Sequence, residues 1–339
     1  MKTASSLADL RNKHSIDSAV LACGVFDGVH RGHQQIVQEL RAIADKQNVP
    51  AVVLTFEPHP RAVLELDLGP PRLTDTNQKI ELLHHYGADA VVVLDFSEHL
   101  ANLDANAFLN EYLLAPGFTI KGICIGEDWR FGKNAKGDIE FLRHQGDKHN
   151  FLVKAVPAVH CQQQPISSTK IRELILKGEL SSVETMLGRP YAVRGKVIKG
   201  KQVGGTHLSC PTANLTITEL LLPPAGVYAG TGRILTEHSR EQNQPRPGII
   251  YVGNAPTIKT DADREQAVEF HFFNLNDNLY NQYIEIEFYN FIREEKTFAS
   301  ADDLSQQIKT DIRHAEQALS KRHSQTDNFY SKNKNRIQK

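Results

Sequence analysis

The stretch GVFDGVHRGH, residues 24–33, decides the fold of the first half of this chain. An apolar run over 18–26 leads into it, and residues 31–48 then place apolar side chains along one helical stripe. The pattern predicts a buried strand, a glycine-rich turn and a helix. Glycines let the backbone approach a ligand closely, and the start of a helix offers free N–H groups and the positive end of its dipole. The turn therefore predicts an anion-binding site.

Two histidines end this turn. His30 and His33 are one helical turn apart, so both side chains can point at the same anion. The alternative is a pair of ordinary exposed histidines at the start of a helix. Zinc is not expected here, because two histidines at this spacing without an evident third ligand are weak support for a metal site.

The rest of the first half alternates strands and helices. Apolar runs predict strands over 50–56, 88–96, 120–126 and 151–156, and the segments around them predict helices over 77–86, 104–114 and 137–149. Near-continuous apolar strands separated by helices predict a Rossmann-like α/β fold, with a parallel sheet covered on both faces. In such sheets ligands bind at the carboxyl ends of the strands, which is where the turn at 24–33 lies.

The pattern changes near residues 187–190. Beyond them lie alternating and β-branched runs that are separated by turns and not by helices. These runs predict strands over 191–199, 226–235, 246–253, 267–273 and 282–293. They favour a small antiparallel β-barrel, closed by a helix that begins at the capping sequence Ser300–Asp303 and carries an apolar stripe over 304–319.

The chain is therefore expected to contain two domains and a tail. We place an α/β domain at 1–186, a β-barrel domain at 187–320 and a flexible tail at 321–339, where six basic side chains accompany one acidic side chain. The length of 339 residues and the hydrophobic content of 40% suit two domains with cores of their own. The same composition excludes a disordered chain.

Composition also limits the function. With 39 basic and 40 acidic residues, the chain has no overall attraction for nucleic acid or for an anionic membrane. No apolar run reaches the roughly 18 residues of a transmembrane helix, and the N-terminal residues lack the apolar core of a secretory signal. The four cysteines form no C-x-x-C pair, which argues against zinc binding and redox chemistry. We expect a cytoplasmic protein without nucleic-acid or membrane partners.

A second polar cluster lies at 165–172. Its hydroxyl side chains, Ser167, Ser168 and Thr169, stand at the expected start of a helix, and Arg172 follows one turn later. This order suits a polyphosphate, although a plain Ser/Thr helix cap would use the same residue types. The histidine turn supports the polyphosphate interpretation of this cluster, because both features would bind an anionic ligand.

The motifs together resemble those of one enzyme family. Besides GVFDGVHRGH, the first half contains TFEPHP at 55–60, GEDWRFG at 126–132 and ISSTKIR at 166–172, and the second half contains PTAN at 211–214, GVY at 226–228, EFH at 269–271 and NLY at 278–280. In this order they resemble the prokaryotic-type bifunctional riboflavin kinase/FMN adenylyltransferase, also called FAD synthetase. The resemblance spans nearly the whole chain. It implies an α/β nucleotidyltransferase domain followed by a riboflavin-kinase-like barrel.

The resemblance implies two reactions that use ATP and Mg²⁺, from riboflavin to FMN and from FMN to FAD. For the second reaction it implies His30, His33 and Arg172 as catalytic residues. It places the nucleotide at Gly24, Phe26, Asp27, Gly28, Gly32, Asp128, Ser167, Ser168 and Thr169, and the flavin at Pro58, His59 and Pro60, where a merely rigid turn is the alternative. An ionised phosphate is already a nucleophile, so this site must align two polyanions and stabilise their charge, without a general base.

The kinase reaction needs different chemistry. The 5′-hydroxyl of riboflavin is neutral and benefits from a base, and Glu269 matches the catalytic glutamate of the family. Thr212 and Asn214 match the residues that hold Mg²⁺ and the nucleotide phosphates, and Mg²⁺ commonly binds through few protein oxygens. An outward-facing strand residue is the alternative interpretation of Glu269, because alternation alone does not distinguish the two.

The barrel half departs from the family in several places. Thr206, Ser209 and Cys210 stand where the family has arginine, glycine and an aromatic residue, and Tyr251 and Ala255 replace an asparagine and an arginine. A phosphate-facing loop that loses a cation and a glycine is expected to bind ATP less well. One alternative is therefore an FMN adenylyltransferase whose barrel is a weakly active or inactive flavin-binding module. Another is a nucleotidyltransferase for a different phosphorylated metabolite, and the oligomeric state is left open.

Overall fold

The computed structural model describes residues 1–339 except 65–68, 200–211, 236–243, 255–265, 276 and 338–339. The described chain separates into two compact units. The first comprises Met1–Lys170 with Met186–Gly188, and the second comprises Ile171–Thr185 with Arg189–Lys339. Residues 171–185 thus group with the second unit, whereas the sequence placed them before an expected boundary at 186.

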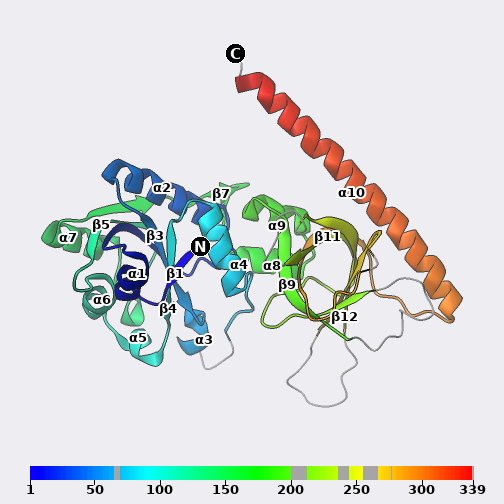
Figure 1. Cartoon of the computed structure of the whole chain (residues 1–339), viewed down its shortest axis with the longest axis horizontal. Helices are drawn as coiled ribbons and strands as arrows, with labels where there is room; N and C mark the ends of the chain where they lie inside the picture. The colour runs from blue at the N-terminus through cyan, green and yellow to red at the C-terminus, as the bar shows by residue number, and fades with distance from the viewer. Residues whose placement is uncertain (65–68, 200–211, 236–243, 255–265, 276, 338–339) are drawn as a thin grey trace. The chain divides into compact units, whose positions relative to one another are not determined.

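The first unit is built on a parallel sheet, as the apolar runs predict (Figure 1). Among the described residues its strand order is β1-β4-β3-β2-β5-β6. The strands are β1 (Lys2–Ala4), β2 (Ser18–Cys23), β3 (Ala51–Glu57), β4 (Ala90–Asp95), β5 (Thr119–Gly126) and β6 (Leu152–Val156). The sequence did not predict β1, because three residues are too few for a periodic pattern to show.

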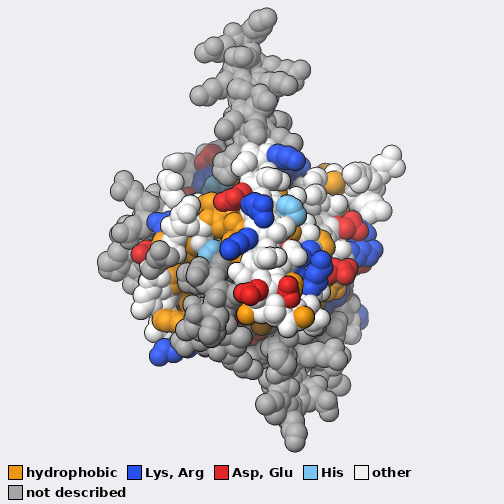
Figure 2. All heavy atoms as spheres, turned by 90° about the vertical axis from the view of Figure 1, so that its right-hand side faces the viewer, with side chains coloured by type: hydrophobic (Ala, Val, Ile, Leu, Met, Phe, Trp, Pro, Cys, Tyr) orange, Lys and Arg blue, Asp and Glu red, His pale blue; other side chains and the backbone are white. Residues whose placement is uncertain are grey.

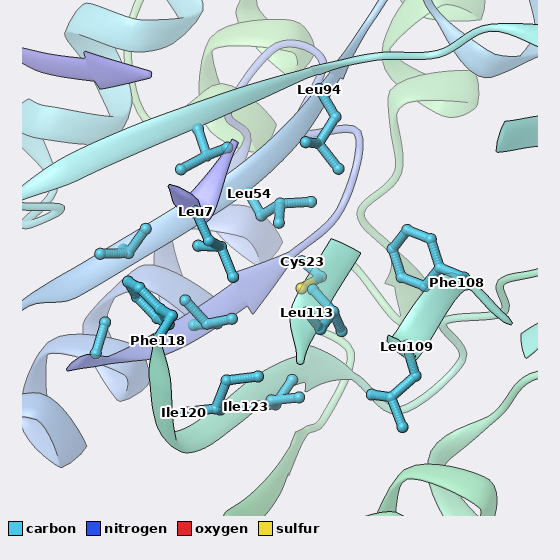
Figure 3. Packing of buried hydrophobic residues seen from close by; sticks show 14 of the residues in the cluster. Leu7, Cys23, Leu54, Leu94, Phe108, Leu109, Leu113, Phe118, Ile120 and Ile123 are labelled. Atoms are coloured by element: carbon cyan, nitrogen blue, oxygen red, sulfur yellow. The ribbon is translucent and has the colours of Figure 1, made fainter. Parts of the chain in front are cut away.

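Helices cover both faces of this sheet. They are α1 (Leu7–His14), α2 (Arg31–Gln47), α3 (Pro60–Leu64), α4 (Thr76–His85), α5 (Glu98–Asn102), α6 (Ala105–Phe108) and α7 (Ile139–His149). Successive residues of β2 point to opposite faces: Leu21 and Cys23 join the cluster that includes α1, α6 and α7, part of which Figure 3 shows. Val20 and Ala22 join the cluster that includes α2 and α4. Two covered faces explain why this strand is apolar throughout.

The helix expected at 104–114 begins as the sequence predicts and then changes character. The Asp104 side chain caps it by accepting the Ala107 N–H at 2.8 Å. After α6 the chain widens into a π-helical turn, η1 (Leu109–Leu113). Two short elements follow in this unit, the 3₁₀ turn η2 (Lys133–Ala135) and a small hairpin of β7 (His160–Cys161) and β8 (Gln164–Pro165).

The second unit contains a closed antiparallel barrel, which confirms the fold expected for the second half. Going round the barrel, the order is β10-β13-β12-β11-β14-β9, and β9 pairs with β10 to close it. The strands are β9 (Tyr191–Ile198), β10 (Ala213–Thr216), β11 (Gly226–Leu235), β12 (Arg246–Asn254), β13 (Gln266–Phe272) and β14 (Tyr283–Arg293). The sequence did not predict β10, whose four residues follow a proline. Two helices, α8 (Ser168–Leu176) and α9 (Leu180–Leu187), precede the barrel in the chain.

A long helix, α10 (Ala301–Ile337), ends the chain. The Ser300 hydroxyl caps it by accepting the Asp303 N–H at 3.1 Å and donating to the Asp303 carboxylate at 2.7 Å. Buried Asp311 pairs with Arg293 of β14 at 2.8 Å and so attaches the helix to the barrel. The backbone is helical through Ile337, where the sequence favoured a tail from 321, and the flexibility of that tail stays a prediction. Within the described residues, no helix has the length and apolar character needed to cross a membrane.

Candidate active sites

The turn after β2 has a backbone shape that requires glycine at position 28. Phe26, Gly28 and Val29 adopt positive φ angles of 54°, 79° and 38°. At Gly28 a Cβ atom would also lie 2.8 Å from Cδ1 of Leu73, so both the backbone conformation and the available space call for glycine. Because α2 begins at Arg31, the turn places the start of a helix, with the positive end of its dipole, at the end of β2.

The structure brings His30 and His33 together. Their rings stack with centroids 3.6 Å apart and planes at 17°, and the edge of Phe26 lies against His33 at 5.1 Å. Buried His30 is the N-cap of α2, and its Nδ1 accepts the backbone N–H of His33 at 3.4 Å. A neutral ring that accepts at Nδ1 carries its proton on Nε2. Gly32 leaves room for this ring, since a Cβ there would lie 3.2 Å from Cε1 of His30.

The histidine turn lies where the strand order of the sheet reverses. From β2 the chain adds β3 and β4 on one side, and then β5 and β6 on the other side of β2. In open parallel sheets, ligands bind at such a switch point outside the carboxyl ends of the strands. The neighbouring β5 ends at Gly126, where a Cβ would lie 3.1 Å from Oδ1 of Asp128. Asp128 therefore stands at the same edge of the sheet as the histidines.

Asp27 has a structural partner within this turn. Its buried carboxylate accepts the backbone N–H groups of Leu73 at 3.0 Å and of Thr74 at 3.2 Å. The Thr74 hydroxyl in turn accepts the Gly28 N–H at 3.1 Å. These bonds fix the turn to the loop before α4. The nucleotide contact that the resemblance implies for Asp27 stays a prediction.

The hydroxyl cluster at 167–169 divides into a cap and a bridge. Ser167 Oγ accepts the Lys170 N–H at 3.2 Å, which is the helix-capping role that the sequence left open. Ser168 instead donates to the carbonyl oxygen of Asp27 at 2.9 Å, so the start of α8 is tied to the histidine turn. Thr169 follows in the same first turn of α8, and Arg172 lies one helical turn after Ser168.

The segment expected on the flavin side connects β3 to α3. His59 Nδ1 accepts the Arg61 N–H at 3.2 Å, and Pro60 is the first residue of α3. Pro58 follows Glu57 through a cis peptide bond. The hydrogen bond of His59 agrees with the rigid-turn interpretation, and the segment lies at the carboxyl end of β3, next to β2. Flavin binding by Pro58, His59 and Pro60 stays a prediction.

The residues expected for the kinase lie side by side on neighbouring barrel strands. The register sets Glu269 of β13 opposite Asn214 of β10 on one side and opposite Tyr251 of β12 on the other. The Thr212 hydroxyl, just before β10, donates a hydrogen bond of 3.1 Å to Oε2 of Glu269. Glu269 alternates with buried apolar residues of β13, so it faces away from the barrel core. Glu269 is therefore an outward-facing strand residue, and it also lies beside Thr212 and Asn214.

Tyr251 brings an aromatic ring to this cluster. Its hydroxyl donates to the Glu295 carboxylate, and burial together with the charge of Glu295 raises the pKa of the phenol above its ordinary value. Gly253 makes room for the ring, because a Cβ there would lie 2.6 Å from Cε1 of Tyr251. The other departures from the family, Thr206, Ser209, Cys210 and Ala255, lie outside the described residues.

The donor atoms of this cluster fit a hard cation. Thr212, Asn214 and Glu269 offer hydroxyl, amide and carboxylate oxygens, which are ligands that Mg²⁺ prefers. Mg²⁺ usually binds few protein atoms and takes other ligands from the phosphates of its substrate. In the part of the chain that the structure describes, no three His, Cys, Asp or Glu side chains gather as a metal-binding group. A magnesium ion shared with bound phosphates is the metal that this chemistry suits.

The structure also shows a residue that the sequence analysis missed. Lys79 on α4 is buried, with its Nζ 3.3 Å from the carbonyl oxygen of Phe56 and 3.5 Å from that of Val25. A signal for it existed in the sequence. Lys79 precedes Leu83 by four residues, which places it on the buried face of the helix. A cation at a buried helical position is unusual enough to mark a site.

Two family models match the chain and correspond to its two folds. The family described as FAD synthetase matches residues 12–170, and the family described as riboflavin kinase matches residues 187–319. Together with the site at the sheet's switch point and the carboxylate cluster on the barrel, they define a class of protein. It is a two-domain enzyme with an FAD-synthetase α/β domain and a riboflavin-kinase barrel.

Similar proteins span both domains. A bifunctional riboflavin kinase/FMN adenylyltransferase of Escherichia coli (strain K12) is 34% identical over 307 residues, which cover 89% of this chain and 95% of the relative. One of Haemophilus influenzae is 34% identical over 310 residues, covering 90% and 97%. A solved structure described as a macrolide-efflux protein from Streptococcus pneumoniae shares the fold, with a TM-score of 0.76, 29% identity and coverage of 91% and 96%. The chain belongs to the bifunctional riboflavin kinase/FMN adenylyltransferase family.

Proposed function

We propose that this chain makes FAD from riboflavin in two ATP-dependent steps. The barrel phosphorylates riboflavin to FMN, and the α/β unit adenylylates FMN to FAD. One observation supports the proposal most strongly: the stacked His30–His33 pair stands at the switch point of the sheet in a chain that matches both family models.

In the adenylyl transfer, a phosphate oxygen of FMN attacks the α-phosphorus of ATP. A new P–O bond forms, the bond from the α-phosphorus to the bridging oxygen breaks, and pyrophosphate leaves. No proton has to be removed from the nucleophile, so the site works by alignment and charge stabilisation. His30 holds a proton on Nε2 for donation to a phosphate oxygen, since its Nδ1 accepts the His33 N–H. We assign Ser168, Thr169 and Arg172 to the departing polyphosphate.

In the kinase reaction, Glu269 accepts the proton of the riboflavin 5′-hydroxyl. The hydroxyl oxygen forms a bond to the γ-phosphorus of ATP, and ADP leaves. The hydrogen bond from Thr212 fixes the orientation of the Glu269 carboxylate, with Oε1 left for the substrate. Thr212 and Asn214 would hold Mg²⁺, which when bound neutralises charge on the phosphates.

The alternative of an adenylyltransferase with an inactive barrel has less support. The riboflavin kinase model matches the whole barrel, and Thr212, Asn214 and Glu269 stand together in the structure. Thr206 and Ser209, which differ from the family pattern, still lead us to expect that the kinase needs a higher ATP concentration than the adenylyltransferase does.

We also propose that the enzyme acts in the cytoplasm on small molecules alone. The near-balance of 39 basic and 40 acidic residues gives no overall attraction for polyanions. On the face shown in Figure 2, basic and acidic side chains of the described residues are interspersed. Such a mixed surface does not favour nucleic acid or an anionic membrane.

Product chromatography tests the proposed function. Purified protein is incubated with ATP and Mg²⁺ and with either riboflavin or FMN, and the flavins are separated. We expect FMN and FAD from riboflavin, and FAD from FMN. FAD from FMN without any FMN from riboflavin, at every ATP concentration, would establish the inactive-barrel alternative. No product from either flavin would reject both.

A further inference from the structure

Lys79 connects two segments of the adenylyltransferase centre that are far apart in the sequence. Its ammonium group donates to the carbonyl oxygens of Phe56 at 3.3 Å and Val25 at 3.5 Å. Val25 belongs to the histidine turn after β2, and Phe56 belongs to the TFEPHP segment of β3. The two carbonyls lie near the carboxyl ends of adjacent parallel strands. Lys79 therefore bridges the side expected to bind the nucleotide and the side expected to bind the flavin.

Groups near Lys79 make further contacts with the carboxyl end of β3. Glu57, its last residue, accepts the Thr76 hydroxyl at 2.6 Å and pairs with Arg72. The Lys79 ammonium lies 3.9 Å from the same carboxylate. The Val25 carbonyl also accepts the hydroxyl of buried Thr55 at 2.9 Å. The segment from Arg72 to Lys79 thus contacts β3 at its carboxyl end.

The same segment holds the histidine turn. The N–H groups of Leu73 and Thr74 donate to the Asp27 carboxylate, and the Thr74 hydroxyl accepts the Gly28 N–H. One stretch of chain therefore contacts both sides of the centre. Lys79 touches both sides with one side chain.

A packing role alone does not account for a lysine here. Its side chain is 6% exposed, and burying an ammonium group is costly unless polar partners compensate. Burial is the main cause that lowers the pKa of Lys79 to about 8; the charge of Asp27 works in the opposite direction, and the charge of Arg72 adds to the lowering. A methionine would fill similar space without this cost. Packing therefore does not explain why the side chain at position 79 carries a charge and hydrogen-bond donors.

We infer that Lys79 is a positioning residue for FMN adenylylation, whose ammonium fixes the turn after β2 against the segment after β3. This inference rests on the proposed adenylyltransferase function. The distance between these segments sets the approach of the FMN phosphate to the α-phosphate of ATP. A displacement of about 1 Å in a reacting group can cost about 10²-fold in rate.

The inference includes a pH dependence. The charged groups that face Lys79 are Asp27 and Glu57, from the two strand ends, and Arg72, from the loop before its own helix. Carboxylates and guanidinium groups ordinarily keep their charge between about pH 7 and about pH 10. Above its pKa of about 8, Lys79 loses its charge and holds the two carbonyls less strongly. Adenylylation should therefore decline on the basic side of pH 8.

The test compares Lys79→Met, Lys79→Arg and, as a matched control, Lys46→Met, which changes an exposed lysine of α2. Each full-length protein is assayed for FAD from FMN and for FMN from riboflavin between pH 7 and pH 9.5. We expect Lys79→Met to lose about tenfold or more in kcat for FAD formation. Riboflavin phosphorylation should be unchanged, and Lys46→Met should match the wild type. Lys79→Arg should regain part of the lost activity and lack the basic decline, since arginine stays charged.

Each outcome decides between explanations. Lys79→Met with full FAD formation would overturn the inference, and a wild type that makes no FAD would reject the proposed function instead. If Lys79→Met loses both activities through unfolding, the pH profiles decide. A wild-type profile without a basic decline, or the same decline in Lys79→Arg, would overturn the positioning role.

Discussion

The two catalytic centres that we propose for this chain are held in place by different means. The adenylyltransferase centre lies on a turn whose shape depends on groups far away in the sequence, such as Leu73, Thr74 and Lys79. The kinase centre lies on paired strands, where the register alone sets Asn214, Glu269 and Tyr251 in a row. A centre of the first kind should respond to changes in its supports, whereas one of the second kind should respond mainly to changes in the reacting groups.

The largest expected effect belongs to the kinase centre. Glu269→Gln keeps the size of the side chain and its capacity to accept the Thr212 hydrogen bond, but the amide cannot accept the substrate proton. FMN formation from riboflavin should fall by about 10²- to 10⁴-fold, the usual contribution of a general base. FAD formation from supplied FMN should not change. Both rates are measured on one preparation by flavin chromatography.

An unchanged kinase rate in this variant would contradict the proposed role of Glu269. It would show that the row of residues on the barrel is not the reacting centre. A loss of both activities, with the fold intact by circular dichroism, would mean that the two centres are not independent.

The histidine pair gives the next largest effect. His30→Ala and His33→Ala should each reduce FAD formation from FMN by about 10²-fold, in line with the loss of one charge-stabilising donor. His30→Ala also removes the N-cap of α2, so its thermal stability should fall more than that of His33→Ala. Riboflavin phosphorylation serves as the internal control. Normal FAD formation in both variants would show that the histidine pair does not belong to the adenylyltransferase centre.

The sequence indicated residues that the structure brings together, such as His30 with His33 and Thr212 with Glu269, but it did not indicate the groups that support them. The turn at 24–33 was recognisable because its glycines and histidines are contiguous in the sequence. Lys79 was not recognised, because its partners Val25 and Phe56 come from two other segments and present only backbone oxygens. Backbone acceptors have no sequence signature.

The fold shows the same limit. Long apolar runs such as β11 were predicted to within a residue or two, since alternation or continuous burial extends over many positions. The short β10 was missed, although it carries Asn214. Its four residues become a strand only because β9 and β13 flank them in the closed barrel. A tertiary pairing of this kind cannot be deduced from local pattern.

Gly28→Ala alters the shape of the histidine turn and leaves the side chains of His30 and His33 in place. Alanine at a φ of +79° costs about 1–2 kcal/mol, and its Cβ would meet the Leu73 side chain. Gly178→Ala in the second unit is the matched control, because its φ is +73° but its Cβ would find ordinary contacts of 3.8 Å. Urea unfolding should show a larger loss of stability for Gly28→Ala. Only that variant should lose FAD formation, by about tenfold if the turn shifts by a fraction of an ångström.

Equal effects of the two alanines on FAD formation would contradict this expectation. They would indicate that general destabilisation, and not the shape of the turn, limits the reaction.

The smallest expected effect tests whether the barrel centre depends on its unusual tyrosine. Tyr251→Phe removes the hydrogen bond to Glu295 but keeps the ring opposite Glu269, and Tyr251→Asn restores the residue that the family resemblance implies. An exposed hydrogen bond and a cross-strand aromatic contact are each worth about 1 kcal/mol or less. If the register alone positions Glu269, both variants should keep riboflavin phosphorylation within about fivefold of the wild type, since 1.4 kcal/mol corresponds to about tenfold. A larger loss in Tyr251→Asn than in Tyr251→Phe, seen mainly in the KM for riboflavin, would assign the ring itself to substrate binding. The kinase centre would then depend on the Tyr251 side chain as well as on the strand register. The kinase centre and the histidine turn would then differ less in how they are held in place.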